Sequence, residues 1–326
     1  MAIPDFNPFE DFVFDDKVCF LSGEKLSYPQ KHLVFPSWIL DDYKLSGQSF
    51  KMLDEGHKLY DQVEVPCSDY VKSFWDALDK EVREASEGGY KAMQSLDQIK
   101  LFQWIGLWVY GVIFNEIQVG IRQQVLSGEA LNFSQVLVKK FSNLHLMLKS
   151  LIFPVEFETL NPFSVRIFPV NNPADFFKYR DEINTLVFSL RMKDFGIIAC
   201  LQDNGANFKY HEEVLSFIEG KTLHPIQFEE ICARVFYSGY LFNRLPEYTV
   251  SPTEDVIYIE PMSLIGMDAR PIFDYWQNKT YAQVLENFWK PWGYTLFEVL
   301  KDPENPMSFL KDASGNFLKE PNLALG

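Results

Sequence analysis

The longest apolar stretch of the chain, residues 101–114, constrains the fold more than any other segment. Gln103 interrupts it and Asn115 and Glu116 follow it, so it falls short of the roughly 20 apolar residues that span a bilayer. Its large side chains surround a helix instead of forming one stripe, which is typical of a helix buried on all sides. We therefore expect a central core helix and no membrane span.

Capping signals place the helices of the first half of the chain. Ser95, followed three residues later by Gln98, forms a capping-box pattern, which predicts that the core helix starts there and runs to about residue 127. An earlier helix is predicted over residues 68–86, where apolar side chains recur every fourth position. A third helix is predicted over residues 134–151.

The second half of the chain is richer in strand signals. Segments with many Val, Ile and Phe residues predict strands at residues 163–170, 184–190 and 195–201. The turn sequence Asp203-Asn204-Gly205 predicts a hairpin that ends near Tyr210. Further predictions are a helix over residues 225–244, a strand over 255–260, a helix over 280–289 opened by a capping box at Thr280, and a loosely held segment over the last two dozen residues.

These elements predict an α+β fold instead of an alternating α/β fold, because helices gather in the middle and strands cluster after them. We expect a small, irregular, ββα-like module at the N-terminus, central buried helices, and a mostly antiparallel sheet with helices in the C-terminal part. Gly88-Gly89 suggests two domains, residues 1–88 and residues 89–326. The alternative is one compact unit, with the buried helix packed against both parts.

Composition limits the partners and the compartment. The net charge is −15, and residues 1–80 hold eight lysines, no arginine and fifteen acidic residues, a net charge of −7. Nucleic acid is therefore an unfavourable partner, since its binding needs a cationic surface. Four scattered cysteines and an N-terminus without a signal-peptide pattern predict a soluble protein of the reducing cytoplasm. The sequence does not indicate an oligomeric state.

One stretch carries a pattern of catalytic residues. Residues 19–23 read Cys-Phe-Leu-Ser-Gly, residues 31–38 read Lys-His-Leu-Val-Phe-Pro-Ser-Trp, and residues 65–70 read Val-Pro-Cys-Ser-Asp-Tyr and open a helix. This order resembles that of HNH-endonuclease-like proteins with a zinc ribbon, in which two C-x-x-C knuckles flank a His before a V-x-P-x-W run. The resemblance covers about the first 85 residues.

The resemblance implies roles for three residues. Cys19 and Cys67 match the first cysteine of each zinc knuckle, and His32 matches the general base that activates water beside a divalent metal. The second cysteine of each knuckle is replaced by Ser22 and Tyr70. Two thiolates cannot close a structural zinc site without other ligands.

The surroundings of His32 depart from the family pattern as well. Lys31 stands where an acidic residue is usual, and Val71 stands where an asparagine would orient the histidine. The leading prediction is a module that keeps its shape without metal. The alternatives are a metal, most simply zinc, held by a substituted ligand set, and a disulfide between Cys19 and Cys67.

Other candidate residues have simpler interpretations. Gly220-Lys221-Thr222 resembles the end of a phosphate-binding loop but lacks its first glycine, and His211-Glu212-Glu213 lacks the second histidine of a zinc protease. His145 and His224 are predicted to be packed or capping residues, and Cys200 and Cys232 to be buried small apolar residues. Aromatic residues that could line a ligand groove or fill a core are Phe176, Phe177, Trp276, Trp289 and Trp292.

Three functions follow from these observations. The leading hypothesis is a non-catalytic protein that acts by binding another protein, with no catalytic residue and no cofactor. The first alternative is a metal-dependent HNH-type nuclease with atypical ligands, in which His32 is the base. The second alternative is a small-molecule binder with an aromatic pocket in its C-terminal half.

Overall fold

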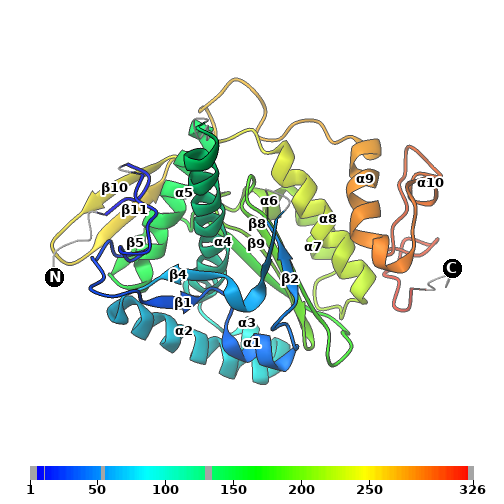
Figure 1. The fold of residues 1–326 in the computed structure, drawn as a ribbon. Coiled ribbons are helices and arrows are strands. Elements are labelled where there is room, and N and C mark those ends of the chain that lie inside the picture. The colour runs from blue at the N-terminus through cyan, green and yellow to red at the C-terminus, as the bar shows by residue number, and fades with distance from the viewer. Residues whose placement is uncertain (1–5, 11, 53–55, 129–133, 322–326) are drawn as a thin grey trace. The chain divides into compact units, whose positions relative to one another are not determined.

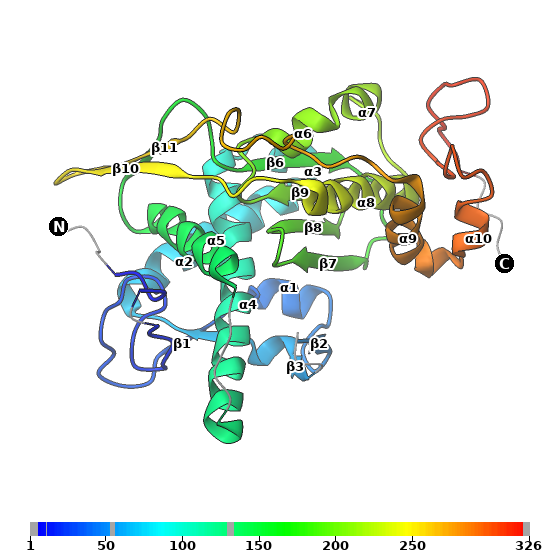
Figure 2. The same cartoon turned by 90° about the horizontal axis from the view of Figure 1, so that it is seen from above.

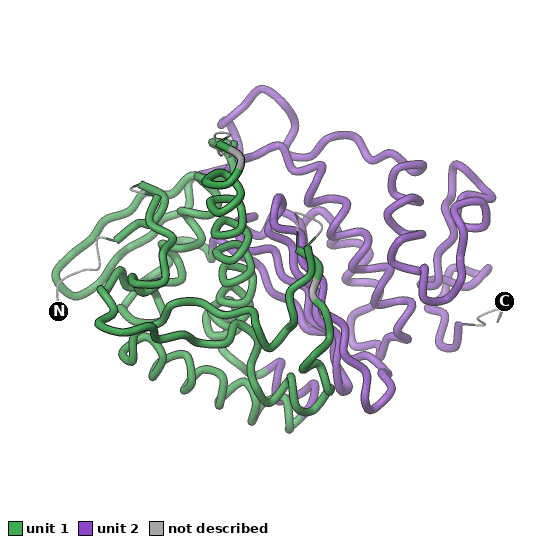
Figure 3. Tube along the Cα trace, viewed as in Figure 1, with its two compact units in different colours: residues 1–88, 95–161, 247–262 green, residues 89–94, 162–246, 263–326 purple. Residues whose placement is uncertain are grey.

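A computed structural model describes residues 6–10, 12–52, 56–128 and 134–321. The predicted α+β class is confirmed, including the buried central helices and the antiparallel sheet of the C-terminal part. The chain forms two compact units, coloured separately in Figure 3. Unit 1 contains residues 1–88, 95–161 and 247–262, and unit 2 contains residues 89–94, 162–246 and 263–326.

Unit 1 is built around one long helix, α4 (Gln98–Ser127). Helices α2 (Asp69–Glu87) and α5 (Gln135–Leu148) pack against it. The side chains of Trp104 and Trp108 are completely buried, as expected for a helix that is apolar on all sides. By length and composition alone α4 could cross a membrane, but 72% of its most apolar stretch is buried within the structure. It is the core helix that the sequence predicts.

The start of α4 differs from the prediction. Asp97 is the N-cap and its carboxylate accepts a hydrogen bond from the Ile99 N–H at 2.7 Å, so Ser95 lies outside the helix. Aspartate is as good an N-cap as serine, and the pattern contained both. Gly128, with φ 73°, ends the helix in the left-handed conformation that glycine adopts without strain.

The remaining elements of unit 1 are short. They include strand pairs that match the irregular module expected near the N-terminus, and a three-stranded sheet in the order β10-β11-β5. These elements are β1 (Lys31–Leu33), α1 (Ser37–Asp42), β2 (Ser49–Lys51), β3 (His57–Leu59), η1 (Tyr60–Gln62), β4 (Glu64–Pro66), η2 (Lys149–Leu151), β5 (Val155–Phe157), β10 (Tyr248–Pro252) and β11 (Ile257–Pro261).

Unit 2 is centred on a four-stranded antiparallel sheet in the order β6-β9-β8-β7. Its strands are β6 (Ser164–Pro169), β7 (Phe177–Glu182), β8 (Val187–Met192) and β9 (Phe195–Cys200). Every residue of β8 and β9 is buried, because both strands lie inside the sheet. Strand β7 was not predicted, because it lacks an apolar run; its Lys, Arg, Asp and Glu residues suit a strand at the sheet edge.

The predicted hairpin after β9 is wrong. The carboxylate of Asp203 accepts hydrogen bonds from the backbone N–H groups of Gly205 and Asn207 and from the hydroxyl of Ser164. These bonds stabilise the start of a helix, so the chain continues as α6 (Ala206–Tyr210) and not as a strand.

Helix α8 (Pro225–Leu241) packs on this sheet and lies beside α9 (Asn278–Trp289), as Figures 1 and 2 show. The predicted start of α8 is confirmed, with Pro225 in its first turn and a capping box between His224 and Gln227. The predicted N-cap of α9, Thr280, is wrong by three residues, because Gln277 is the N-cap and Thr280 lies inside the helix. The other helices of unit 2 are α3 (Gly89–Gln94), α7 (Glu212–Phe217), η3 (Lys290–Trp292) and α10 (Leu296–Val299).

The C-terminal segment is held more firmly than the sequence predicts. Phe309 and Leu310 are buried, and the Gln227 side chain donates hydrogen bonds to the carbonyls of Phe309 and Leu318 at 2.7 Å each. Buried apolar side chains and these hydrogen bonds together attach the segment to α8. The last five residues, 322–326, lie outside the described part of the chain.

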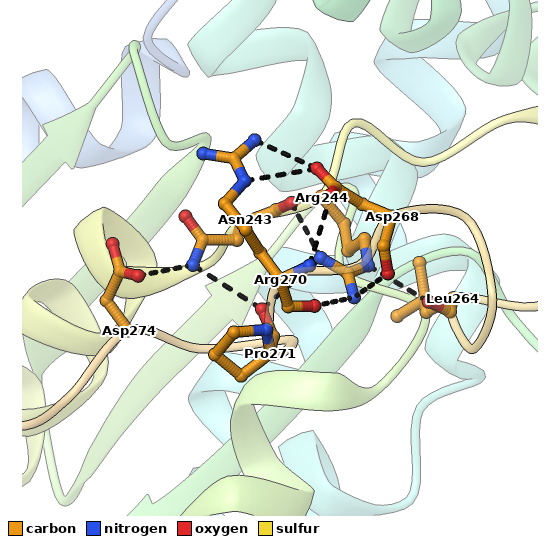
Figure 4. A network of polar contacts seen from close by, with 7 residues as sticks. All are labelled: Asn243, Arg244, Leu264, Asp268, Arg270, Pro271 and Asp274. Carbon is orange, nitrogen blue, oxygen red and sulfur yellow. Dashed lines mark hydrogen bonds and ion pairs between the residues drawn. The ribbon is translucent and has the colours of Figure 1, made fainter.

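A buried arginine fixes the segment that leads to α9. The guanidinium of Arg244 donates to the carbonyls of Leu264, Arg270 and Pro271, the shortest contact being 2.6 Å to Arg270 (Figure 4). Several carbonyls of one loop thus converge on one cation, which a lysine with fewer and less directional donors could not reproduce.

Candidate functional site

The structure brings together two of the residues that the resemblance singles out. Strand β1 pairs with β4, and the Phe20 N–H donates to the Pro66 carbonyl at 2.9 Å, which places Cys19 next to Cys67. Both are free, buried thiols that hydrogen-bond to each other. This bond lowers the pKa of Cys19 and raises the pKa of Cys67, because one sulfur carries the first negative charge and the other keeps its proton.

His32 lies in the same module but is fully engaged by its neighbours. Its ring stacks on Trp75 with the centroids 4.4 Å apart. Its Nδ1 lies 2.7 Å from the Leu33 carbonyl oxygen, and its Nε2 lies 2.9 Å from a carboxylate oxygen of Asp76. A carbonyl and a carboxylate oxygen thus occupy the hydrogen-bonding positions of both ring nitrogens, where a substrate proton or a metal would have to approach.

Among the residues that the structure describes, no third metal ligand joins the two thiols. Within residues 6–10, 12–52, 56–128 and 134–321, no group of three or more His, Cys, Asp or Glu side chains could hold a metal ion. Tyr70, at the position of a missing knuckle cysteine, donates instead to the Ile152 carbonyl at 3.0 Å. The nuclease alternative therefore lacks its ligand set in the part of the chain that the structure describes.

Four of the other histidine and cysteine candidates are buried inside the protein. His145 is buried and burial lowers its pKa to about 3, while burial lowers the pKa of His211 to about 4. Cys200 and Cys232 are buried, as predicted. Burial of each of these side chains favours its neutral form.

A different region of unit 2 has the form of a ligand site. A pocket of about 790 Å³ opens beside the start of β7, the start of α8 and η3. Its lining combines aromatic and proline side chains with a few polar groups, and consists of Asn171, Asn172, Pro173, Phe176, Phe177, Lys178, Arg191, His224, Pro225, Pro291 and Trp292. This volume and composition are typical of small-molecule sites.

Three of the predicted aromatic candidates line this pocket. Phe176 lies against the Arg191 guanidinium, whose central carbon is 4.0 Å from the ring centroid, and Trp292 lies 5.9 Å from the same carbon. Phe177 is the third aromatic wall. The remaining two candidates have other positions, since Trp289 is buried in the core and Trp276 packs on Tyr237.

The polar end of the pocket is a buried charge cluster. Arg191 is only 3% exposed, and its Nε lies 3.3 Å from a carboxylate oxygen of Glu229. The other carboxylate oxygen of Glu229 lies 2.7 Å from the Lys178 ammonium. Burial lowers the pKa of Lys178 and the pKa of Arg191, and Glu229 opposes both shifts. The cluster contains two cationic side chains and one carboxylate.

Neighbouring residues fix the orientation of this cluster. The Asn172 amide donates to the carbonyls of Met192 and Phe195, which directs its own oxygen to an Arg191 Nη1–H at 3.2 Å. His224 accepts the Ile226 N–H at Nδ1, as its predicted capping role requires, so the neutral ring carries its hydrogen on Nε2. Burial and the charge of Arg191 lower the pKa of His224 and favour this neutral form.

Comparison with known proteins gave no match to a family model, to a curated protein or to a solved structure. The resemblance of the N-terminal module to HNH-like proteins therefore stays a prediction.

The sequence reasoning missed the polar half of the pocket. Lys178 belongs to the strand that was not predicted, and His224 was assigned only a capping role. Arg191 carries the one signal that was available, because a charged residue that follows the apolar run of β8 must be paired if the strand is buried. Nothing in the sequence indicates that Glu229, from a helix, is its partner.

Proposed function

We propose that the chain is a non-catalytic binding protein whose site is the pocket of unit 2, and that its ligand is a small organic molecule with a flat apolar body. The observation that carries this proposal is the pocket itself, where Phe176, Phe177 and Trp292 provide apolar walls around a fixed polar end. Such walls bury most of a ligand, while a few polar groups orient it.

The geometry favours this function over the two others. In the nuclease hypothesis His32 would act as a base, but both of its ring nitrogens face acceptors. Binding to another protein stays a prediction, with no particular surface of the described residues to support it. The preorganised polar end of the pocket supports a small ligand, because ordered groups lose little conformational entropy when the ligand binds.

A thermal-shift screen of metabolites against the full chain tests the proposal. A ligand at 100 times its dissociation constant should stabilise the protein by about 2.7 kcal/mol, which gives a clear rise in Tm. For each hit, Trp292→Ala should weaken binding about tenfold or more in calorimetry, because it removes an aromatic wall.

Phe297→Ala is the matched control, since Phe297 is 84% exposed, belongs to unit 2 and does not line the pocket. This variant should bind each hit as the unaltered protein does. Hits that bind equally well to Trp292→Ala, or a screen without any hit, would contradict the proposed site.

A further inference from the structure

We propose that the ligand is an organic anion, with a carboxylate or phosphate group received at the polar end of the pocket by Arg191, Lys178 and His224. This inference rests on the proposed binding function and goes further by naming the chemical class of the ligand.

The first argument is an unsatisfied donor. The Arg191 Nε–H is buried and makes no hydrogen bond among the described residues, because its approach to Glu229 is an ion pair at 3.3 Å without hydrogen-bond geometry. The only hydrogen bond of this guanidinium within the described part of the chain is the one from Nη1 to Asn172. A buried guanidinium with unused donors is costly unless a further acceptor joins it.

The second argument is the charge of the cluster. Glu229 is 3% exposed and neutralises one of the two cations, which leaves one positive charge at the wall of the pocket. An anion on the pocket side would complete the neutralisation of buried charge. A neutral ligand would leave that charge uncompensated.

The third argument is the polarity of other groups that line the same pocket. Because His224 accepts at Nδ1, its remaining ring hydrogen is on Nε2, where it is a donor. Pro225, also in the lining, is the first residue of the 17-residue helix α8, so the positive end of the helix dipole lies at the pocket. The charged donors, the neutral donor and the helix end that line this pocket thus all favour negative charge within it.

The structural alternative is that Lys178 and Arg191 serve only to neutralise Glu229. In that case their replacement would change stability but would not distinguish anionic from neutral ligands. Matched probes separate the two cases, because they keep the apolar body constant and change only the charge.

The experiment uses the full chain and four probes, measured by calorimetry and by ligand-detected NMR. Naphthylacetate is compared with naphthylacetamide, and naphthyl phosphate with naphthol, so that the two pairs distinguish a carboxylate from a phosphate preference. At least one anion should bind about tenfold more tightly than its neutral partner, as expected for charge-assisted hydrogen bonds. Added salt should weaken the binding of that anion more than that of its neutral partner.

Two variants complete the test. Lys178→Met should reduce the preference for the anion over its neutral partner to about threefold or less. Lys209→Met is the control, because Lys209 is exposed on α6 in the same unit, and it should keep the preference. If Lys178→Met does not fold, the comparison of paired probes on the unaltered protein still tests whether the pocket prefers an anionic ligand to a neutral one.

The outcomes separate the two proposals. Equal binding of anionic and neutral probes would overturn the anion inference and leave the proposed pocket in place. An anion preference that Lys178→Met does not reduce would overturn the assigned site of the anion. Failure of all four probes to bind at millimolar concentration would overturn both proposals.

Discussion

At the scale of single residues, Asp79 shows how burial changes an ordinary carboxylate. It lies on α2 in unit 1, and its carboxylate accepts a hydrogen bond from the Trp104 indole N–H at 2.9 Å. Burial raises its pKa to about 7 despite that bond, and the negative charge of Asp76 contributes to the rise. The folded protein therefore holds a proton that the unfolded chain releases near pH 4.

This difference predicts a loss of stability as the pH rises. Between about pH 4 and pH 7 the folded state binds more protons than the unfolded state, so the free energy of unfolding falls with pH and levels off above pH 7. Asp79→Asn keeps an oxygen acceptor for Trp104 and removes the titration. Urea unfolding at pH 8 should show the variant to be more stable by about 1–2 kcal/mol, with little difference below pH 4.

The control for this prediction is Asp42→Asn, which changes an exposed carboxylate in the same unit. It should leave the pH dependence unaltered. Asp203, whose pKa burial raises to about 6, keeps its own contribution in both variants, so the slope should decrease without vanishing. An unchanged slope in Asp79→Asn would contradict the assignment.

At the scale of elements, the contact between β9 and α8 depends on one glycine. Gly196 lies on β9, and a Cβ atom there would come within 2.4 Å of the Phe228 ring on α8. The absent side chain lets a large ring lie directly on the strand. The Phe228 side chain is only 1% exposed, so other core residues surround the ring and it cannot turn away toward solvent.

Gly196→Ala is therefore expected to destabilise the protein by about 2–3 kcal/mol, because overpacking forces the ring or the strand to shift. Chemical denaturation of the single variant measures this loss. The double variant Gly196→Ala/Phe228→Leu should lose less than the sum of the two single losses, since the smaller side chain relieves the clash. Strictly additive losses would show that the two residues do not meet.

At the scale of the whole molecule, the C-terminal segment is attached to the rest of unit 2 through buried polar groups of α8. Glu230 is fully buried and accepts hydrogen bonds from the Ser308 hydroxyl at 2.7 Å and from the Phe309 N–H at 2.8 Å. Arg234 pairs with the same carboxylate at 3.2 Å. A segment far away in the sequence thus completes the surroundings of a buried charge.

Glu230→Ala should release this segment before the rest of the chain unfolds. Hydrogen exchange at the Phe309 amide should become faster by a factor of ten or more, because the variant removes its acceptor. Limited proteolysis should then cut between residues 302 and 318 first. Glu213→Ala, at an exposed position of α7, is the control and should leave both measurements unaltered. If Glu230→Ala also left both measurements unaltered, the apolar contacts of Phe309 and Leu310 would hold the segment alone and the prediction would be contradicted.

Local patterns predicted most of the fold where the signal was strong and continuous. The buried α4, the start of α8 at Pro225 and the strands β6 and β9 follow from periodicity, caps and β-branched runs. The errors occurred where a side chain decided the outcome through its contacts. Asp203 started a helix where the sequence predicted a hairpin, and Asp97 took the cap assigned to Ser95.

The sequence by itself determined the α+β class, the core helix and the presence of aromatic residues at 176, 177 and 292, because these depend on composition and local spacing. Tertiary structure alone decided that those aromatics surround Arg191, Lys178 and His224, which come from two strands and the start of a helix. It also decided that His32 faces two acceptors. The physical reason is that a site depends on distances between residues far apart in the chain, which only the packed core sets.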